Sequence, residues 1–227
     1  MNFLSYLYYM FYRPKIFYPK RSYSMLGEDL VVEKFFKKKQ KGFYVDVGCY
    51  HPLDGNNTFL LYRKGWSGIN VDLNKTSIEL FKIARKNDVN LNLAISKKSQ
   101  KIKYYYRKKI NMLNTINKKF AKTSFRKGFK TGSIQSQTLN SILNKSEFKN
   151  KKIDFLNLDI EGNEINALKS LDLIKYNPKL ICVEIHNNTS GRKAKDYLKN
   201  NPIYKFLYKK GYKYIWNNEF SYIFMRK

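Results

Sequence analysis

Polar side chains follow the ends of five apolar, strand-like segments of this sequence. In chain order they are Asp46 and Gly48, Asp72 and Asn74, Ser96, Asp159 and Glu161, and Glu184 and His186. The carboxyl ends of parallel strands meet at one edge of a sheet, and in open α/β sheets the ligand crevice lies outside that edge. Carboxylates collected at such an edge favour a ligand that carries positive charge.

The loop after the first segment reads DVGCYHPLDG, residues 46–55. A dinucleotide needs a G-x-G-x-x-G turn and unobstructed helix N-terminal amides for its pyrophosphate. This loop has one early glycine and a carboxylate beside it, which argues against an NAD-dependent dehydrogenase. S-adenosylmethionine fits better, because Asp46 can anchor its cationic end, directly or through water, while Gly48 lets the backbone approach closely. Asp72 is placed to accept hydrogen bonds from both ribose hydroxyls, as an acid does in NAD sites.

The elements that would position these residues alternate along the chain. Strand patterns cover 42–48, 68–74, 90–96, 152–162 and 179–186, and helical patterns cover 27–36, 56–65, 76–87, 163–172 and part of 194–211. A Thr or Ser cap is expected for helix 76–87. Two last strand patterns, 212–216 and 220–227, predict an antiparallel pair. This alternation indicates an α/β fold with a doubly wound, mostly parallel sheet.

The pattern loosens after residue 97. Strand-like segments at 101–107 and 132–138 flank a basic, polar stretch without a clear period. We interpret 97–130 as a variable insertion or lid within a domain that spans 24–227. Residues 1–23 form a separate aromatic and basic segment, whose apolar run is short of the roughly 20 residues that span a bilayer. This segment suits a membrane interface, the protein's own core or a second copy of the chain.

Composition indicates a folded, strongly basic protein. Of 227 residues, 43% are hydrophobic and 16% aromatic, which excludes a disordered chain. The excess of 45 Lys and Arg over 17 Asp and Glu gives a net charge of +28. Such a surface attracts nucleic acid, anionic glycans or acidic lipid, although an AT-rich genome produces a similar composition without any partner. Cys49 and Cys182 lie in apolar strand patterns typical of reduced, buried thiols, which indicates the cytoplasm.

Six segments together resemble the FkbM-type methyltransferases: GEDLVVEKFF, GFYVDVGCYHPLDGNNT, LYRKGWSGINVDLN, NLAIS, LNLDIEGNE and PKLICVEIH. The resemblance runs in order from about Ser24 to His186. Met25 stands where the family commonly has glutamine, and Cys49 where it often has alanine. The resemblance implies a Rossmann-like class I methyltransferase, S-adenosylmethionine as cofactor, and O-methylation of a sugar or polyketide hydroxyl.

The resemblance also assigns candidate site residues. The cofactor pocket is expected to contain Asp46, Gly48, Cys49, Tyr50, Asp72, Leu73, Asn74, Ala94 and Asp159. Transfer to a hydroxyl also needs a proton acceptor. His186 is the candidate general base because its pKa is ordinarily near neutrality, with Glu184 to orient it and Asp159 to assist.

Alternative roles for these residues stay open. His186 can instead contact substrate, and His51 competes with it as a base or serves as a turn element. Asp159 and Glu184 could ligate a divalent cation. Cofactor anchoring by Asp159, and helix N-terminal charge for Glu161, are simpler explanations, so no metal site is predicted.

The leading hypothesis is an S-adenosylmethionine-dependent O-methyltransferase acting on a hydroxyl of a sugar, a polysaccharide or other glycan, or a related small molecule. An anionic or lipid-linked acceptor would suit the basic surface, in the cytoplasm at the inner face of a membrane. The main alternative is methylation of a nucleic-acid ribose 2′-hydroxyl. It is less favoured because no lysine stands at the strand ends. A cofactor-binding protein without catalysis is the third class.

Overall fold

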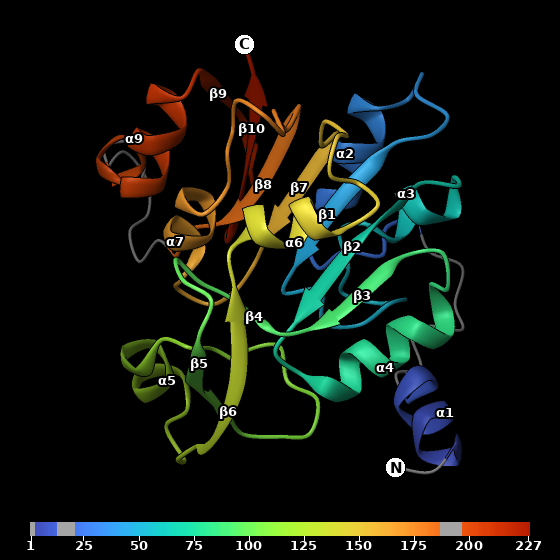
Figure 1. Cartoon of the computed structure of the whole chain (residues 1–227), viewed down its shortest axis with the longest axis vertical. Coiled ribbons are helices and arrows are strands. Elements are labelled where there is room, and N and C mark those ends of the chain that lie inside the picture. Colours follow the sequence, from blue (N-terminus) through green and yellow to red (C-terminus); the bar gives the residue numbers. More distant parts are fainter. Residues whose placement is uncertain (1–2, 13–20, 187–196) are drawn as a thin grey trace.

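A computed structural model describes residues 3–12, 21–186 and 197–227 of the chain (Figure 1). The helices are α1 (Phe3–Phe11), α2 (Glu28–Phe35), α3 (Phe59–Arg63), α4 (Lys75–Ala84), α5 (Lys118–Ser124), α6 (Leu139–Lys145), α7 (Glu164–Lys169) and α9 (Pro202–Lys209). The strands are β1 (Phe43–Val47), β2 (Ser67–Asp72), β3 (Val89–Asn92), β4 (Ala94–Ile95), β5 (Lys101–Tyr106), β6 (Lys130–Gln137), β7 (Phe155–Leu158), β8 (Leu180–Glu184), β9 (Tyr212–Asn217) and β10 (Ser221–Arg226).

The main sheet has the strand order β3-β2-β1-β7-β8-β10-β9. Strands β3, β2, β1, β7 and β8 pair in parallel, while β10 pairs antiparallel with both β8 and β9. The chain builds outward from β1 to β2 and β3, and then returns to add β7 and β8 on the other side. The order therefore switches between β1 and β7, which places a ligand crevice at their carboxyl ends. The predicted doubly wound sheet with a terminal antiparallel pair is confirmed.

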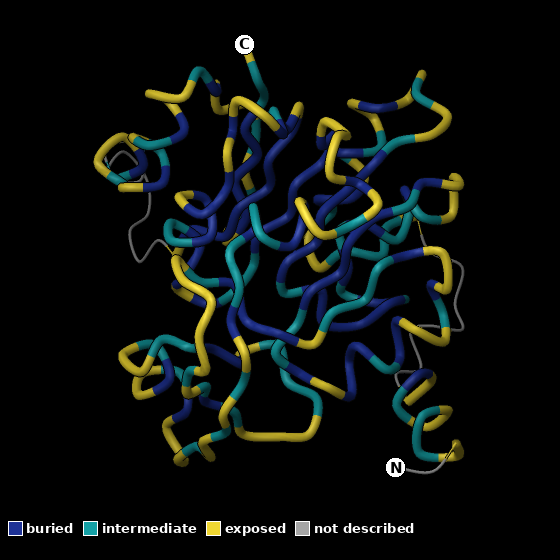
Figure 2. The backbone as a smooth tube through the Cα atoms, viewed as in Figure 1, coloured by how far each residue is buried: buried dark blue, intermediate teal, exposed yellow. Residues whose placement is uncertain are grey.

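Helices cover both faces of this sheet because successive strand residues point to opposite sides. In β1, Phe43, Val45 and Val47 join a core cluster with α6, α7 and α9. Tyr44 points to the other face and packs in a second cluster with α2 and α3. Figure 2 shows the result, a sheet whose central strands are buried between exposed helical surfaces.

The expected strand 90–96 is wrong as a single element. Its first part is β3, which pairs with β2 in the main sheet, and its second part is β4, which pairs with β6 in a separate three-stranded sheet of order β4-β6-β5. The Asn92 side chain donates to the carbonyls of Asp72 and Leu73, at 3.0 and 2.9 Å. These bonds hold Asn92 to the loop after β2, and the chain then turns into the small sheet.

The expected strand-like segments 101–107 and 132–138 are β5 and β6, and α5 lies in the stretch between them that showed no clear period. The small sheet and α5 lie below the main sheet in Figure 1. The α1 helix lies beside α4 and leaves Phe3, Leu4 and Tyr8 at least 64% exposed. Residues 13–20 of the segment 1–23, and the first part of the expected helix 194–211, lie outside the described residues. Within the described part of the chain, every helix is too short or too polar to cross a bilayer.

Candidate active site

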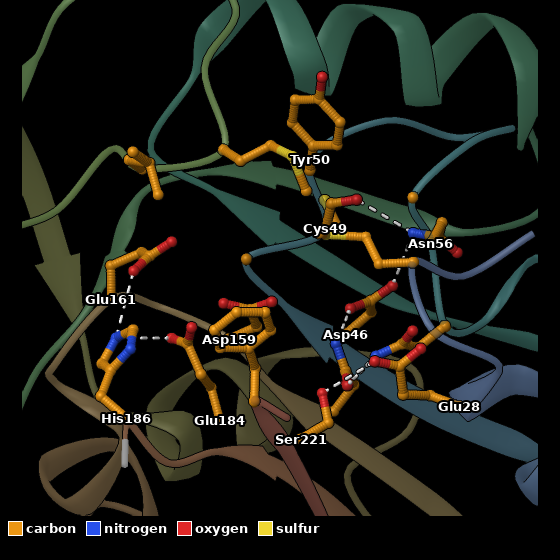
Figure 3. A pocket seen from close by; sticks show the side chains of 18 of the residues that line it. Glu28, Asp46, Cys49, Tyr50, Asn56, Asp159, Glu161, Glu184, His186 and Ser221 are labelled. Carbon is orange, nitrogen blue, oxygen red and sulfur yellow. Dashed lines mark hydrogen bonds and ion pairs between the residues drawn. The ribbon is translucent and has the colours of Figure 1, made fainter. Parts of the chain in front are cut away.

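A cavity of about 560 Å³ opens at the carboxyl ends of β1, β7 and β8 (Figure 3). Its acidic lining residues are Glu28, Asp46, Asp159, Glu161 and Glu184. His186 also lines it, and none of its described lining residues is Lys or Arg. In a protein with a net charge of +28, this cavity is an acidic site within a basic molecule.

A narrower cavity adjoins the first and contains other predicted cofactor residues. Asp72, Leu73 and Ala94 line it, and Gly48 and Asp159 line both cavities. All the predicted cofactor residues except Asn74 thus line one or both of these adjoining spaces. The space at β2 is the smaller one, of about 30 Å³, and the space at β1 is the larger.

Asp46 anchors the loop that follows β1. Its fully buried carboxylate accepts hydrogen bonds from Asn56 Nδ2 at 3.1 Å, Thr58 Oγ1 at 2.8 Å and Asn157 Nδ2 at 2.9 Å. Donors of the chain therefore already bind both carboxylate oxygens. Anchoring of the loop explains why β1 ends in a carboxylate, and a role of Asp46 toward a cationic ligand remains a prediction.

Arg85, which the sequence analysis missed, holds the same loop from the other side. Its fully buried guanidinium donates to Thr58 Oγ1 at 2.8 Å, and to Asn56 Oδ1 and the Pro52 carbonyl at 2.7 Å each. It also lies over the Phe81 ring, 4.7 Å from the centroid. An arginine at the end of a helical pattern ordinarily extends into solvent, so the sequence carried no signal for this role.

Gly48 is required by the packing of the chain against itself. Its φ of +81° lies in the left-handed region, and a Cβ at this position would lie 1.7 Å from the Asp159 carbonyl oxygen. The space that the missing side chain leaves is therefore filled by the loop after β7. The same close approach brings Asp159 to the edge of the cavity.

The next three residues have different environments. Cys49 is 1% exposed and packs with Ile78 and Phe81, and burial raises the pKa of its thiol well above the usual range. Tyr50 lines the larger cavity. His51 is fully buried and lies outside the lining of both cavities, with Nε2 3.1 Å from the Tyr9 carbonyl and Nδ1 accepting from a backbone amide.

Asp72 and Asn74 organise the loop after β2. The two oxygens of Asp72 accept hydrogen bonds from the backbone amides of Tyr50, at 2.9 Å, and Asn74, at 2.7 Å. Burial raises the pKa of Asp72 to about 6, so the carboxylate is ionised at neutral pH. Each oxygen keeps a further lone pair for a ribose hydroxyl.

The Asn74 side chain forms the N-cap of α4, accepting from the amides of Thr76 and Ser77. The expected Thr or Ser cap of this helix, Thr76 or Ser77, was therefore two or three residues too late. Asn74 also donates to the Lys109 carbonyl. Both ends of its side-chain amide are thus engaged within the chain, and so are its backbone amide, which donates to Asp72, and its carbonyl, which accepts from the Ile78 amide at 3.2 Å. A contact of Asn74 with the cofactor stays a prediction.

Two acids of the loop after β7 differ in their surroundings. Glu164 begins α7 and accepts from the amides of Ile160 and Gly162, at 3.0 Å each. Glu161 has a left-handed backbone with φ 58° and lines the cavity. Burial, together with the charge of Glu184, raises the pKa of Glu161 and of Glu164 to about 7. Burial, together with the charges of Glu184, Glu161 and Glu164, raises the pKa of Asp159 well above its usual range.

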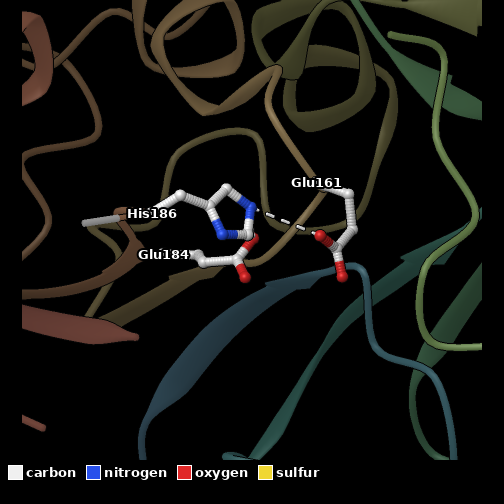
Figure 4. A group of neighbouring side chains, drawn as sticks. All are labelled: Glu161, Glu184 and His186. Carbon is white, nitrogen blue, oxygen red and sulfur yellow. Dashed lines mark ion pairs between the residues drawn. The ribbon is translucent and has the colours of Figure 1, made fainter. Parts of the chain in front are cut away.

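His186 lies between two of these acids (Figure 4). Its Nε2 is 3.4 Å from Glu161 Oε2 and 3.3 Å from Glu184 Oε2. The ring stacks on Phe120 of α5, with centroids 5.0 Å apart. Interaction with Glu161 and Glu184 raises the pKa of His186 to about 10, so the ring is an imidazolium at neutral pH. It becomes a base only after its proton has moved to a carboxylate or has been displaced.

The strand order, the acid after β2 and the crevice at the β1–β7 switch point are those of a Rossmann-like fold that binds its ligand at this edge of the sheet. Residues 46–214 match the methyltransferase FkbM domain. The chain therefore belongs to the FkbM methyltransferase family, as the sequence resemblance implied.

Three solved structures are similar in fold. A TehB-like methyltransferase from Corynebacterium glutamicum shares 10% identity over 90% of this chain and 89% of that chain, with a TM-score of 0.44. Monomeric WbdD shares 11% identity over 96% of this chain and 45% of the WbdD chain, with a TM-score of 0.48. The methyltransferase domain of bacterial CtHen1-C shares 12% identity over 88% of this chain and 96% of that domain, with a TM-score of 0.42. No curated protein matches the chain.

Proposed function

We propose that this methyltransferase transfers the methyl group of S-adenosylmethionine to a hydroxyl of a sugar, glycan or related small molecule. The observation that carries the proposal is the acid–histidine group Glu161, Glu184 and His186, which faces the same cavity as the predicted cofactor residues of β1. S-adenosylmethionine supplies the electrophilic methyl on a sulfonium. The acidic lining, without a described Lys or Arg, suits that positive charge.

The residues of the chain then have two tasks. Asp72 binds the ribose hydroxyls, and the loop held by Asp46 and Arg85 sets the position of the cavity wall, so that acceptor and methyl are held in register. The acceptor hydroxyl loses its proton to the acid–histidine group. The single Nε2–H of His186 can donate to only one of the Oε2 atoms of Glu161 and Glu184, so the other carboxylate oxygen is available to receive that proton.

The region 97–130 supports an acceptor beside this group. Met112, Leu113 and Phe120 line the cavity together with the residues of the strand ends and add apolar surface to it. Apolar and aromatic surface beside polar groups suits the face of a sugar ring. Because this region contains none of the six segments that resemble the family, we assign the choice of acceptor to it.

The surface charge bears on the class of acceptor and on location. A net charge of +28 favours an anionic or lipid-linked glycan, held in the cytoplasm at the inner face of a membrane. Exposed Phe3, Leu4 and Tyr8 on α1 would add apolar contact with such a surface. A nucleic-acid ribose is the alternative acceptor, and the lack of a described lysine in the cavity lining disfavours it.

Calorimetric titration of S-adenosylhomocysteine, with NAD as the parallel ligand, tests the cofactor. We expect S-adenosylhomocysteine to bind with micromolar affinity and NAD not to bind. Asp72→Ala should weaken binding by about tenfold or more, because it removes hydrogen bonds to a charged group, worth about 1.5–3 kcal/mol each. His186→Ala should keep the affinity and lower the transfer of labelled methyl to a glycan pool. Equal loss of binding in both variants would contradict this division of roles.

A further inference from the structure

We propose that Glu161, Glu184 and His186 form a binding site for a divalent cation on the acceptor side of the cavity. The sequence predicted no metal site, kept a cation on Asp159 and Glu184 as an alternative, and assigned Glu161 to a helix terminus. Its role in the reaction rests on the proposed function, whereas binding of the ion does not. The three residues each offer one donor atom, and these atoms lie within 4.8 Å of one another.

The distances fit coordination better than hydrogen bonding. His186 Nε2 lies 3.3 Å from Glu184 Oε2 and 3.4 Å from Glu161 Oε2, and neither oxygen has a hydrogen-bond partner. With bonds of about 2.0–2.2 Å to a metal, adjacent donors in a tetrahedral or octahedral shell lie about 3.0–3.5 Å apart. An ion among the three atoms would therefore need little rearrangement.

The two unpartnered oxygens are the independent sign that a ligand belongs here. Glu161 is 5% exposed and Glu184 is 9% exposed, and their Oε2 atoms are out of contact with solvent. A single Nε2–H cannot satisfy two carboxylates, so one buried oxygen stays unpaired whichever way the proton points. A buried anionic oxygen without a partner is costly, and a cation would bind both oxygens at once.

The charges of the cavity also leave a deficit of positive charge. Glu28 is satisfied by the chain, because it accepts from Leu26 N, Asn218 Nδ2 and Ser221 Oγ, at 2.9, 2.7 and 3.0 Å. Asp46 is satisfied by the donors already described. The remaining acids, Asp159, Glu161 and Glu184, face a single imidazole among the described lining residues.

S-adenosylmethionine does not remove this deficit. Its sulfonium and ammonium are offset by its own carboxylate, so it brings one net positive charge, and the product brings none. A divalent ion at the three donors would compensate the acids both before and after methyl transfer.

The donor set indicates the kind of ion and its use. Two carboxylates and one imidazole suit a hard or borderline divalent ion such as Mn²⁺, with open positions for water or an acceptor oxygen. An acceptor hydroxyl bound at an open position would become more acidic and would be held beside the cavity wall that Phe120 forms. With Glu161 and Glu184 bound to the ion, Asp159 would take the hydroxyl proton in their place, and the acceptor oxygen would take the methyl group as the S–CH₃ bond breaks and leaves S-adenosylhomocysteine.

Titration of the metal-stripped protein with Mn²⁺, followed by electron paramagnetic resonance, tests the site. We expect one Mn²⁺ per chain in the wild type. Loss of an outer-shell partner of a metal site typically weakens metal affinity about 10–100-fold. Glu161→Gln and Glu184→Gln each change a direct ligand, so each should weaken Mn²⁺ affinity by at least this factor. Each variant removes one of several buried like charges and should fold, which circular dichroism checks. Glu33→Gln is the matched control, since Glu33 pairs with Lys64 on the surface, at 2.8 Å, and it should bind Mn²⁺ as the wild type does.

Titration with S-adenosylhomocysteine on the same samples separates this inference from the proposed function. If S-adenosylhomocysteine binds and Mn²⁺ does not, the metal site is overturned, and the three residues are an imidazolium ion pair within a methyltransferase. Mn²⁺ binding that both glutamine variants retain would place the ion elsewhere and overturn the site equally. Specific Mn²⁺ binding without S-adenosylhomocysteine binding would support the site and contradict the proposed function.

Discussion

Arg85 is the residue on which the cavity wall depends most. It is a fully buried charge, and its guanidinium donates hydrogen bonds to Pro52, Asn56 and Thr58 of the loop after β1. Thr58 and Asn56 in turn donate to Asp46. The cation and the carboxylate therefore stabilise each other through two neutral side chains, without direct contact.

Arg85→Met should destabilise the protein by about 3–5 kcal/mol, because it leaves the buried carboxylate without its compensating cation. We also expect weaker binding of S-adenosylhomocysteine, since the loop loses the donors that hold it. Urea unfolding followed by circular dichroism measures the first effect, and calorimetry the second.

The control is Arg63→Met, the same change on the surface. Arg63 donates to the hydroxyl of Tyr23 at 2.6 Å in an exposed pair, so its loss should cost no more than about 1 kcal/mol. Similar losses in both variants would mean that the Arg85 network contributes nothing beyond an ordinary surface contact.

The acids after β7 show what sequence could and could not predict for single residues. The pattern D-I-E-G-N-E placed carboxylates at the end of the strand correctly. It did not predict different roles for Glu161 and Glu164, because Glu161 lies just before the helical pattern 163–172 and Glu164 lies in its first turn. The difference in role depends on the backbone: φ of 58° directs Glu161 to the cavity, while Glu164 binds the amides at the start of α7. A left-handed non-glycine residue has no signal in the sequence.

At the scale of elements, the site exists because the ends of β1 and β7 approach closely. The Asp159 amide donates to the Val47 carbonyl at 2.9 Å, and the Asp159 carbonyl fills the space beside Gly48. This contact joins the two halves of the doubly wound sheet at the switch point. Any side chain at position 48 would force the halves apart.

Gly48→Ala should therefore lower the free energy of unfolding by more than about 4 kcal/mol or prevent folding, because a steric clash adds to the strain of a left-handed residue. The matched control is Gly65→Ala. Gly65 has the same φ of +81°, but a Cβ there would meet nothing within 4 Å. Gly65→Ala should therefore lower the free energy of unfolding only by the strain of a left-handed alanine, about 1–2 kcal/mol. Equal unfolding midpoints in urea would show that the close approach is not rigid.

The elements themselves were largely predictable, and the exceptions have physical causes. Regular alternation of apolar strands and amphipathic helices predicted the five parallel strands and the terminal pair. It failed at 90–96, where one apolar run supplies two sheets, because the side-chain bonds of Asn92 that hold it to the loop after β2 are not visible in a periodicity. It also missed α5, a short polar helix that Asn117 caps, since seven residues give too little period to detect.

For the whole molecule, the distribution of charge matters more than its total. The net charge of +28 is carried by the surface, while acids gather in the cavity at the strand ends. The sequence predicted both features separately. That Met112 and Phe120 line the same cavity as the acids depends on contacts far apart in the chain, which local patterns do not encode.

The buried acids make a prediction for the stability of the metal-free protein. The pKa of Asp72, which faces Asp46, is raised by burial from 3.8 to about 6, and that of Glu164, which faces Glu184 and Asp159, from 4.5 to about 7. Between the ordinary and the raised values the folded state binds more protons than the unfolded state, so stability falls as pH rises. The raised pKa of His186 acts in the same direction between 6.5 and about 10.

Thermal unfolding in EDTA should therefore show a melting temperature that decreases from pH 5.5 to pH 8, a range in which ordinary carboxylates stay ionised, their pKa values being about 4. Each kcal/mol lost corresponds to about 2–4 °C for a chain of this size. Glu164→Gln should flatten the slope, because its amide oxygen can still accept from Ile160 and Gly162 while one titrating group is gone. A melting temperature that rises with pH would mean that the folded state binds fewer protons than the unfolded chain, and that the acids at the strand ends are stabilised as anions by donors in their surroundings.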